Sequence, residues 1–405
     1  MTGPRSGQLF TGNAFTAVVF NTSLDNFDLT ANDLKVSKTF ALGDGTTLTP
    51  SGGVYLSSQK VGVTWNFNQY LLEATGDKPA LLTSPINGTP GFGGCCMNTM
   101  DADYRTTSPY AILALESGPF NVDASVRHDS QKATGTFNQT NAIAANAGLR
   151  YDPTQTNTID YKVNHNSYSL GGNYRITKDL ALFARYSDGV SFNADRITFF
   201  NDPRLTNGTA STIPINKVKQ SEAGVKWREG DLSMFVTLFD AKTDETNFDV
   251  TTQKASANTY DAKGVEVEAA YRIGGFRVAG GVTYTDAKIK ASNNPALVGT
   301  TPKRQADFVY QLSPSYSFGD AVIGASIVGT TDSKDDSPAG PITITLPGYT
   351  VVNAFANYQF SQHTAVALGV NNLFDKIGYT ESNDGRQAAR SINGRTVKVS
   401  LKYTF

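Results

Sequence analysis

The sequence predicts an all-β protein, an antiparallel transmembrane β-barrel of about 15–16 strands, and three observations lead to this fold class. First, segment after segment alternates apolar and polar residues with period two, which gives each strand one apolar face and one polar face. Second, short turns alternate with long polar connections. Third, hydrophobic residues make up only 39% of the 405 residues while aromatic residues reach 11%, a balance that suits a polar lumen with aromatic girdles.

The alternation begins near the amino terminus. Residues 34–42 alternate, turn at Gly43-Asp44-Gly45 and return over residues 54–67, and the apolar run Ala14 to Phe20 adds a sixteenth strand if it is one. The further hairpins, each given as strand, turn and strand, are 110–115, 117–119 and 120–126; 168–176, 177–179 and 180–186; 223–227, 229–230 and 232–238; 265–273, 274–275 and 276–284; 308–316, 318–320 and a less regular strand; and 352–360 followed by 366–370.

The unequal connections favour a membrane barrel over a large soluble all-β protein with one wet face. Outer-membrane barrels have short periplasmic turns and long extracellular loops, whereas a soluble sandwich has no reason to separate the two kinds. The charged residues Glu266, Glu268 and Arg272 alternate with apolar residues, and we expect them to face the lumen because charge facing lipid is costly. We therefore predict that the side chains alternating with them face outward, namely Val265, Val267, Ala269 and Tyr271.

Other segments exclude several classes of protein. No stretch approaches the ~18–20 consecutive apolar residues of a membrane-spanning helix. A net charge of −1 gives no indication of nucleic-acid binding. The first residues lack a basic segment followed by an apolar one, so we expect no signal peptide in this sequence and infer that the natural beginning of the polypeptide is missing from it.

The last strand leads to a resemblance. Val397, Val399, Leu401, Tyr403 and Phe405 alternate with polar residues up to the final residue. The segments Asn372-Leu373-Phe374-Asp375-Lys376 and Gly394-Arg395-Thr396, with the Tyr403-Thr404-Phe405 ending, resemble the carboxy-terminal signature of TonB-dependent outer-membrane receptors. Receptors of this family have barrels of twenty-two strands, so the resemblance implies that this chain is a fragment of such a barrel. Residues 1–405 are then expected to be the carboxy-terminal portion of the barrel domain, with no plug domain.

The resemblance also implies a function, namely uptake of a scarce nutrient such as a ferric siderophore across the outer membrane of a Gram-negative bacterium. The implied partners are the TonB-ExbB-ExbD energy-coupling complex, the barrel-assembly machinery, outer-membrane lipid and a small-molecule ligand. The alternative is a passive porin-like channel of about 16 strands, which needs neither a plug nor energy coupling. The loops expected to meet the ligand are 76–107, 129–160, 193–216, 292–303, 331–347 and 375–391.

Specific site residues are predicted only from the resemblance. The family motif is Asn372, Leu373, Phe374, Asp375, Gly394 and Arg395, and the assembly signal is Tyr403 and Phe405. We predict no enzyme, no cofactor and no metal site, because the three histidines are scattered and no nucleophile or phosphate-loop motif occurs with its partner motifs. The adjacent pair Cys95-Cys96 is interpreted as a structural loop feature, with the state of its thiols left open.

Overall fold

The computed structural model describes residues 8–75, 79–83, 98–142, 149–192, 215–249, 254–337, 340–383 and 388–405. Within them almost every segment is a strand. The elements are β1 (Ala14–Ser37), β2 (Phe40–Gly43), β3 (Thr46–Glu73), β4 (Leu81–Thr83), β5 (Asn98–Ser117), β6 (Phe120–Ala142), β7 (Leu149–Arg175), β8 (Leu180–Ser191), β9 (Asn216–Glu229), β10 (Leu232–Asp249), β11 (Lys254–Ile273), β12 (Phe276–Ser292), the 3₁₀ turn η1 (Pro295–Leu297), β13 (Phe308–Phe318), β14 (Ala321–Thr330), β15 (Ser333–Ser337), β16 (Gly340–Leu346), β17 (Tyr349–Gln359), β18 (Thr364–Asn371), β19 (Tyr379–Asn383), β20 (Ala388–Ser391) and β21 (Thr396–Tyr403).

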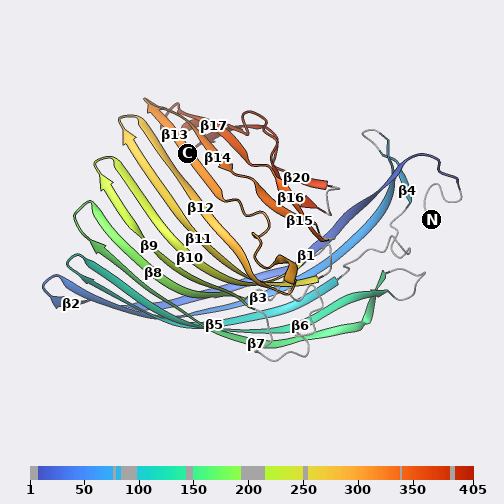
Figure 1. The fold of residues 1–405 in the computed structure, drawn as a ribbon, viewed down its shortest axis with the longest axis horizontal. Coiled ribbons are helices and arrows are strands. Elements are labelled where there is room, and N and C mark those ends of the chain that lie inside the picture. Colours follow the sequence, from blue (N-terminus) through green and yellow to red (C-terminus); the bar gives the residue numbers. More distant parts are fainter. Residues whose placement is uncertain are drawn as a thin grey trace.

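One large antiparallel sheet of seventeen strands carries the fold. Of these, β2 continues the line of β1 and β4 has only three residues, which leaves fifteen long strands that follow one another around the sheet in chain order (Figure 1). Two small hairpins, β15–β16 and β19–β20, stand apart from it. The predicted antiparallel sheet of about 15–16 strands is therefore confirmed.

The predicted tight turns occur where the sequence placed them. For example, β9 ends at Glu229 and β10 begins at Leu232, while β11 ends at Ile273 and β12 begins at Phe276. The first turn residues, Gly230 and Gly274, have φ values of 55° and 54°, a left-handed conformation that glycine adopts without a Cβ clash. All the short turns lie at one end of the sheet, and the long connections lie at the other (Figure 1).

Ala14 to Phe20 lies in a strand, as the apolar run indicated, but it does not add a separate strand. These residues are the start of β1, which pairs with β3 from Ala14 opposite Glu73 to Ser37 opposite Ser51. The polar residues between the two apolar runs continue the ladder, because main-chain hydrogen bonding to β3 does not require an apolar side chain. One strand of 24 residues replaces two shorter ones.

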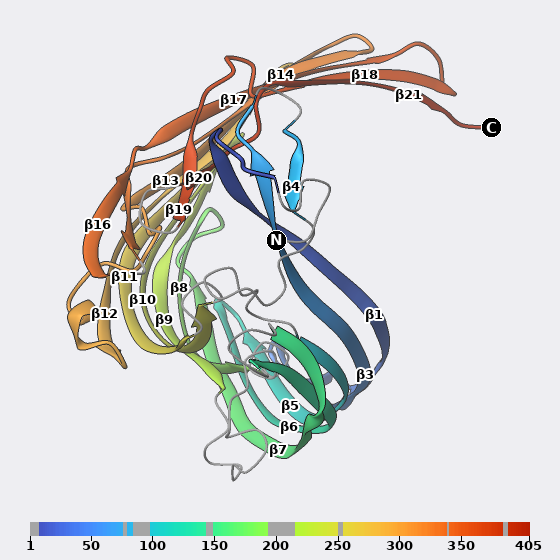
Figure 2. The same ribbon diagram turned by 90° about the vertical axis from the view of Figure 1, so that its right-hand side faces the viewer.

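The sheet is not closed. Among the described residues β1 pairs with β3 and β21 pairs with β18, and no pairing joins β1 to β21. Figure 2 shows the two strands at separate edges of a strongly curved sheet. An incomplete barrel was the expectation, because strand number, tilt and diameter are linked and fifteen strands cannot follow the curvature of a wider cylinder to closure.

The loop ends of β5, β6 and β7 curl together (Figure 2). Buried apolar side chains of these strands and of β3 form one cluster. Ten of them have exposed fractions between 0% and 7%: Val61, Val63, Met100, Ala102, Tyr104, Ala133, Phe137, Ile159, Tyr161 and Val163. Beyond the pair Tyr168–Asp188, β7 no longer pairs with β8 and follows β6 alone. The curl therefore forms where the loop ends of these strands leave the main wall.

Candidate functional site

The large sheet, called the wall from here on, has one apolar face. Register pairing joins one side chain from each strand from β7 to β13 into a continuous row: Tyr174, Leu182, Val225, Val236, Val267, Val282 and Tyr310. One residue further along each strand, the opposite face carries Arg175, Ala181, Lys226, Phe235, Glu268, Gly281 and Gln311. Because a strand's side chains alternate between faces, the first row is suited to lipid and the second to a wetter interior.

The apolar row lies on the convex face of the sheet. On β7, Ile159 and Tyr161 are an even number of residues from Arg175 and so share its face, and both are buried inside the curl. On the other face of β7, Leu170 is 57% exposed. The predicted outward parity of Val265 and its partners follows from the same register, with Glu266 and Glu268 on the concave face.

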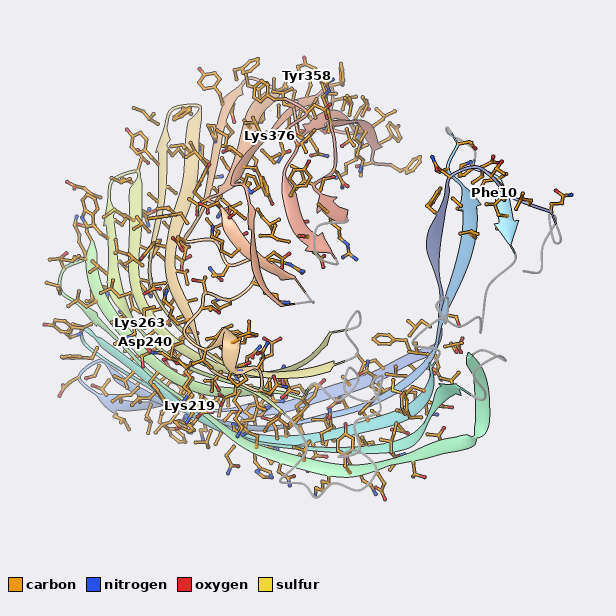
Figure 3. The ribbon with its side chains drawn as sticks, turned by 45° about the vertical axis from the view of Figure 1, so that its right-hand side comes forward. Phe10, Lys219, Asp240, Lys263, Tyr358 and Lys376 are labelled. Carbon is orange, nitrogen blue, oxygen red and sulfur yellow. The ribbon has the colours of Figure 1, made fainter. Side chains whose placement is uncertain are left out.

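A charged pair marks the limit of the apolar face toward the loop end of the sheet. On β10 and β11 the outward row ends at Asp240 opposite Lys263, whose carboxylate and ammonium groups are 3.4 Å apart (Figure 3). Tyr271, at the turn end of the same face, is eight residues from Lys263, or about 26 Å of strand. Because the strands of such barrels tilt by ~35–45°, this length of strand spans roughly 20 Å of the ~25 Å apolar band.

The concave face carries ionic contacts within the wall. The Arg185 guanidinium on β8 donates through Nη2 to Asp123 Oδ1 on β6 and through Nη1 to Ser169 Oγ on β7, both at 2.6 Å. Its register partner on β9 is Glu222. The lumen side therefore contains fixed charges of both signs rather than a uniform potential.

Three connections at the loop end are tied together by one buried carboxylate. Asp335 in β15 has a side chain only 1% exposed, and its Oδ2 accepts hydrogen bonds from Arg304 Nε at 3.3 Å and from the backbone N–H of Ser382 at 2.8 Å. Arg304 also donates to Glu381 at 2.8 Å, and Arg390 lies 3.0 Å from the same carboxylate. The loops after β12, β14 and β18 therefore form one connected surface.

The loop end of the first hairpin holds an acidic side chain of its own. The register shifts between Leu24 and Asn26, which leaves Asp25 without a cross-strand partner on β3. Its carboxylate accepts hydrogen bonds from the hydroxyls of Ser23 and Thr64, each at 2.6 Å, and these hold the pKa of Asp25 below its usual value. This exposed position therefore keeps its negative charge.

The predicted loops agree only in part with the structure. Residues 98–107, expected in a loop, belong to β5, and most of 129–160 belongs to β6 and β7, so those two predictions are wrong over these residues. Residues 193–214 and the pair Cys95-Cys96 lie outside the described residues. The expected loops 331–347 and 375–391 contain the hairpins β15–β16 and β19–β20, and 292–303 contains η1.

The residues of the family motif come together as a clamp between the end of β18 and the start of β21. The Asn372 side chain donates to the carbonyls of Lys376 at 2.9 Å and Asn393 at 3.0 Å, and accepts from the Lys376 N–H at 2.8 Å. Asp375 Oδ1 accepts from the Arg395 N–H at 2.8 Å.

The other motif residues surround this clamp. Arg395 Nη1 donates to the Leu373 carbonyl at 3.4 Å, while Phe374 is 73% exposed and takes no part in the hydrogen bonds. A Cβ at Gly394 would lie 3.2 Å from Asp375 Oδ1, so the glycine leaves room for that carboxylate. The motif therefore fixes a chain crossing through contacts within the chain.

The proposed assembly signal lies on an open edge. β21 pairs only with β18 among the described residues, and its side chains are all exposed. The rings of Tyr403 and Phe405 meet edge-on with centroids 5.1 Å apart, although Phe405 lies beyond the last paired residue. The two aromatics form one exposed group at the end of the strand.

The histidines do not form a metal site in the described part of the chain. His128 Nδ1 lies 2.6 Å from Asn166 Oδ1, His165 Nε2 lies 3.2 Å from Asp188 Oδ1, and the His363 ring meets the Thr404 carbonyl at 3.0 Å. His128 and His165 occupy consecutive register positions of β6 and β7 and so point to opposite faces. No group of three or more potential ligands occurs among the described residues. The described residues also contain no helix with the length and apolar character needed to cross a bilayer.

Comparison with known proteins matches the large sheet from β1 to β18 to one family. A family model described as "TonB dependent receptor-like, beta-barrel" matches residues 3–373. The chain is 24% identical over 351 residues to the heme transporter BhuA of Brucella abortus (strain 2308), covering 78% of this chain and 51% of that protein. It is 21% identical over 331 residues to a probable TonB-dependent siderophore receptor, PiuA of Acinetobacter baumannii, covering 75% and 41%.

Solved structures share the fold. The ferric citrate transporter FecA in its unliganded form aligns with a TM-score of 0.67 at 15% identity, covering 98% of this chain and 56% of that one. The siderophore receptor PiuA from Acinetobacter baumannii aligns with a TM-score of 0.68 at 17% identity, covering 95% and 56%. The chain therefore spans about half the length of the curated relatives it matches.

Proposed function

Because this chain belongs to the TonB-dependent receptor β-barrel family, we propose that it forms barrel wall in an outer-membrane receptor for a scarce nutrient such as a ferric siderophore. Receptors of this family work with TonB and are outer-membrane proteins of Gram-negative bacteria. The observation that carries the proposal is the continuous apolar row on the convex face, backed by a charged concave face.

The relatives support an iron-containing ligand. One is named a heme transporter, one a probable siderophore receptor and one a ferric-pyoverdine receptor, so heme and ferric siderophores are the ligand classes to test first. The connected loops around Asp335 are the described surface on which such a ligand would first arrive. The family is one of transport receptors, and we assign the chain no catalytic step.

We also propose that residues 1–405 are the carboxy-terminal portion of a longer receptor barrel. The open sheet and the half-length coverage of the relatives support this arrangement. The partners would be the TonB-ExbB-ExbD complex for energy, the barrel-assembly machinery for insertion, outer-membrane lipid against the convex face, and the small-molecule ligand in the lumen. In this proposal the two edges of the sheet pair with strands from the rest of the receptor.

The test is growth under iron limitation. The gene that encodes the chain is deleted in a strain without other iron receptors, and growth is measured with heme or a ferric siderophore as the sole iron source, with and without a functional TonB system. We expect growth to require both the gene and TonB. Uptake that continues without TonB would contradict energised transport and favour the passive porin-like channel, which the family match does not support.

A further inference from the structure

A hollow of about 580 Å³ lies on the concave face of the wall at its short-turn end. The turn residues Asp179 and Gly230 line it, so it lies well away from the loop end, where a nutrient would enter. Side chains of strands β7 to β12 line the rest of it. Its volume falls within the ~300–1,000 Å³ of sites that bind small molecules in proteins.

Small side chains lie in the middle of the hollow. Arg228 on β9 is paired in register with Ser233 on β10, and Ser233 is paired with Ala270 on β11. Arg272 follows two residues after Ala270, on the same face of β11. Ser233 and Ala270 therefore separate the two arginines and leave space between their guanidinium groups.

The positive charge around the hollow is not balanced within the described structure. Its only acidic side chains are Asp179 and Asp231, against six basic ones: Arg175, Lys178, Lys226, Arg228, Arg272 and Arg277. Two of the basic side chains have partners, since Lys178 lies 3.9 Å from Asp179 and Lys226 lies 4.9 Å from the centre of the Phe183 ring. No ion pair joins Arg228, Arg272 or Arg277 to a carboxylate among the described residues, whereas Arg185, nearer the loop end, is paired with Asp123.

Two of the arginines are direct register partners. Arg272 on β11 lies opposite Arg277 on β12, and like charges placed directly across two strands repel each other. Such a pair is costly unless an anion lies between or above the two guanidinium groups. Guanidinium groups bind carboxylates through two parallel hydrogen bonds, so this pair favours a bound carboxylate.

The spacing of the three arginines indicates the kind of anion. Neighbouring strands are ~4.8 Å apart, so Arg272 and Arg277 extend from adjacent strands, and Arg228 extends from a strand about 10 Å from that of Arg272. An anion with a single charged group meets only one end of this arrangement. A compact molecule with two or three carboxylates separated by a few carbon atoms reaches both ends, with the Ser233 hydroxyl between them.

We propose that this hollow binds a compact small molecule with two or more carboxylate groups, held by Arg228, Arg272 and Arg277. The inference rests on the proposed function and deepens it. The transported nutrient is then an iron chelate whose chelator carries carboxylates, and the hollow binds it near the short-turn end of the lumen. Phosphate groups pair with guanidinium groups in a similar way, so the test includes both kinds of anion.

The test measures binding of iron-free citrate to the purified full-length protein in neutral-detergent micelles, by isothermal titration calorimetry. We expect citrate to bind at a single site, with an affinity that falls as salt is added, because charged contacts are screened. The uncharged triethyl ester of citrate is expected not to bind. Pyrophosphate that binds as tightly as citrate would overturn the assignment to a carboxylate ligand.

Variants locate the binding. R272Q/R277Q is expected to weaken citrate binding about tenfold or more, since two charge-assisted contacts are lost. K398Q/K402Q makes the same change of charge on β21, at positions of the concave parity, and is expected to bind like the unaltered chain. If R272Q/R277Q fails to fold, R228Q, which leaves the cross-strand pair in place, provides the measurement.

The outcomes separate this inference from the proposed function. Equal citrate binding by the folded arginine variants and the β21 control would overturn the site. Citrate binding that depends on these arginines, without TonB-dependent growth on ferric citrate, would support the site and contradict nutrient uptake. TonB-dependent growth on heme or a ferric siderophore, without citrate binding, would support nutrient uptake and overturn the site.

Discussion

Asn372 provides the sharpest test of how the wall is held together near its carboxy-terminal edge. Its side chain is buried, with the residue only 3% exposed, and makes three hydrogen bonds. Two of them join it to Lys376 in the loop after β18, and one joins it to Asn393 in the segment before β21. The residue also has a φ of 49°, in the left-handed region that asparagine tolerates better than alanine. The substitution Asn372→Ala removes the bonds and strains the backbone.

The expected loss follows from these contacts. Three hydrogen bonds at ~1 kcal/mol each contribute about 3 kcal/mol, and a left-handed alanine adds about 1–2 kcal/mol. We therefore expect Asn372→Ala to lower the free energy of unfolding by about 4 kcal/mol. Asn372→Gly keeps the backbone relaxed, so it is expected to cost less than Asn372→Ala, and the difference measures the strain.

The assay is urea unfolding of the protein in lipid vesicles, followed by tryptophan fluorescence. Asn371 is the matched control, because it is the same residue type one position earlier, and it is exposed with one side-chain contact to Thr396 at 3.2 Å. Asn371→Ala is expected to cost less than about 1 kcal/mol. Equal losses for Asn371→Ala and Asn372→Ala would refute the clamp.

Three further predictions test the faces, the loops and the last residue. Val267→Lys, at the middle of the apolar row, is expected to destabilise the vesicle-inserted protein by about 2–4 kcal/mol in urea unfolding, whereas Glu268→Lys on the lumen face is tolerated; equal costs would contradict the assigned faces. Asp335→Ala is expected to remove the tie between loops and to speed amide hydrogen exchange in β19, and unchanged exchange would contradict it. Deletion of Phe405 is expected to lower outer-membrane abundance without lowering heat resistance, and normal abundance with reduced heat resistance would leave it only a girdle aromatic.

The hairpins that cross the apolar band could be predicted because lipid acts on each strand in the same way. A polar side chain would face hydrocarbon at the positions of Val225, Val236 and Val267. Each strand therefore shows the alternation of apolar and polar residues independently of the others. The turns between them were equally local, since Gly230 and Gly274 follow from the conformation that a tight hairpin needs. Neither inference required knowledge of distant contacts.

The parts of β6 and β7 beyond the band could not be predicted in this way. Residues 129–142 and 149–160 are polar and lack alternation, which is typical of a loop, yet they pair with each other along much of their length. Outside the membrane both faces of a strand can be wet or can meet another strand, so the side chains carry no regular pattern. The hydrogen bonds between paired strands join backbone groups, which every residue has, so the sequence predicts this pairing only weakly.

The clamp and the loop tie show a second limit, which concerns specific pairs. The resemblance identified Asn372 and Asp375 as motif residues, but only the structure shows that their partners are backbone groups of residues 376 and 393–395. Asp335 lies in the expected loop 331–347, and its carboxylate is buried against Arg304 and the Ser382 N–H. A carboxylate's burial depends on the cation that meets it, and here that cation is 31 residues away.

The two faces of the wall differ for the same physical reason. The convex face is in contact with hydrocarbon along its whole length, so any sufficiently apolar side chain is stable there. Its apolar pattern can therefore be predicted without knowing which residues it contacts. The concave face meets particular groups, and a charge there is understood only with the group that balances it. Arg185 has its balance in Asp123 within the wall, while Arg272 and Arg277 face each other without one. The alternation along a strand therefore predicts which residues face the lumen, but it does not predict which groups balance their charge.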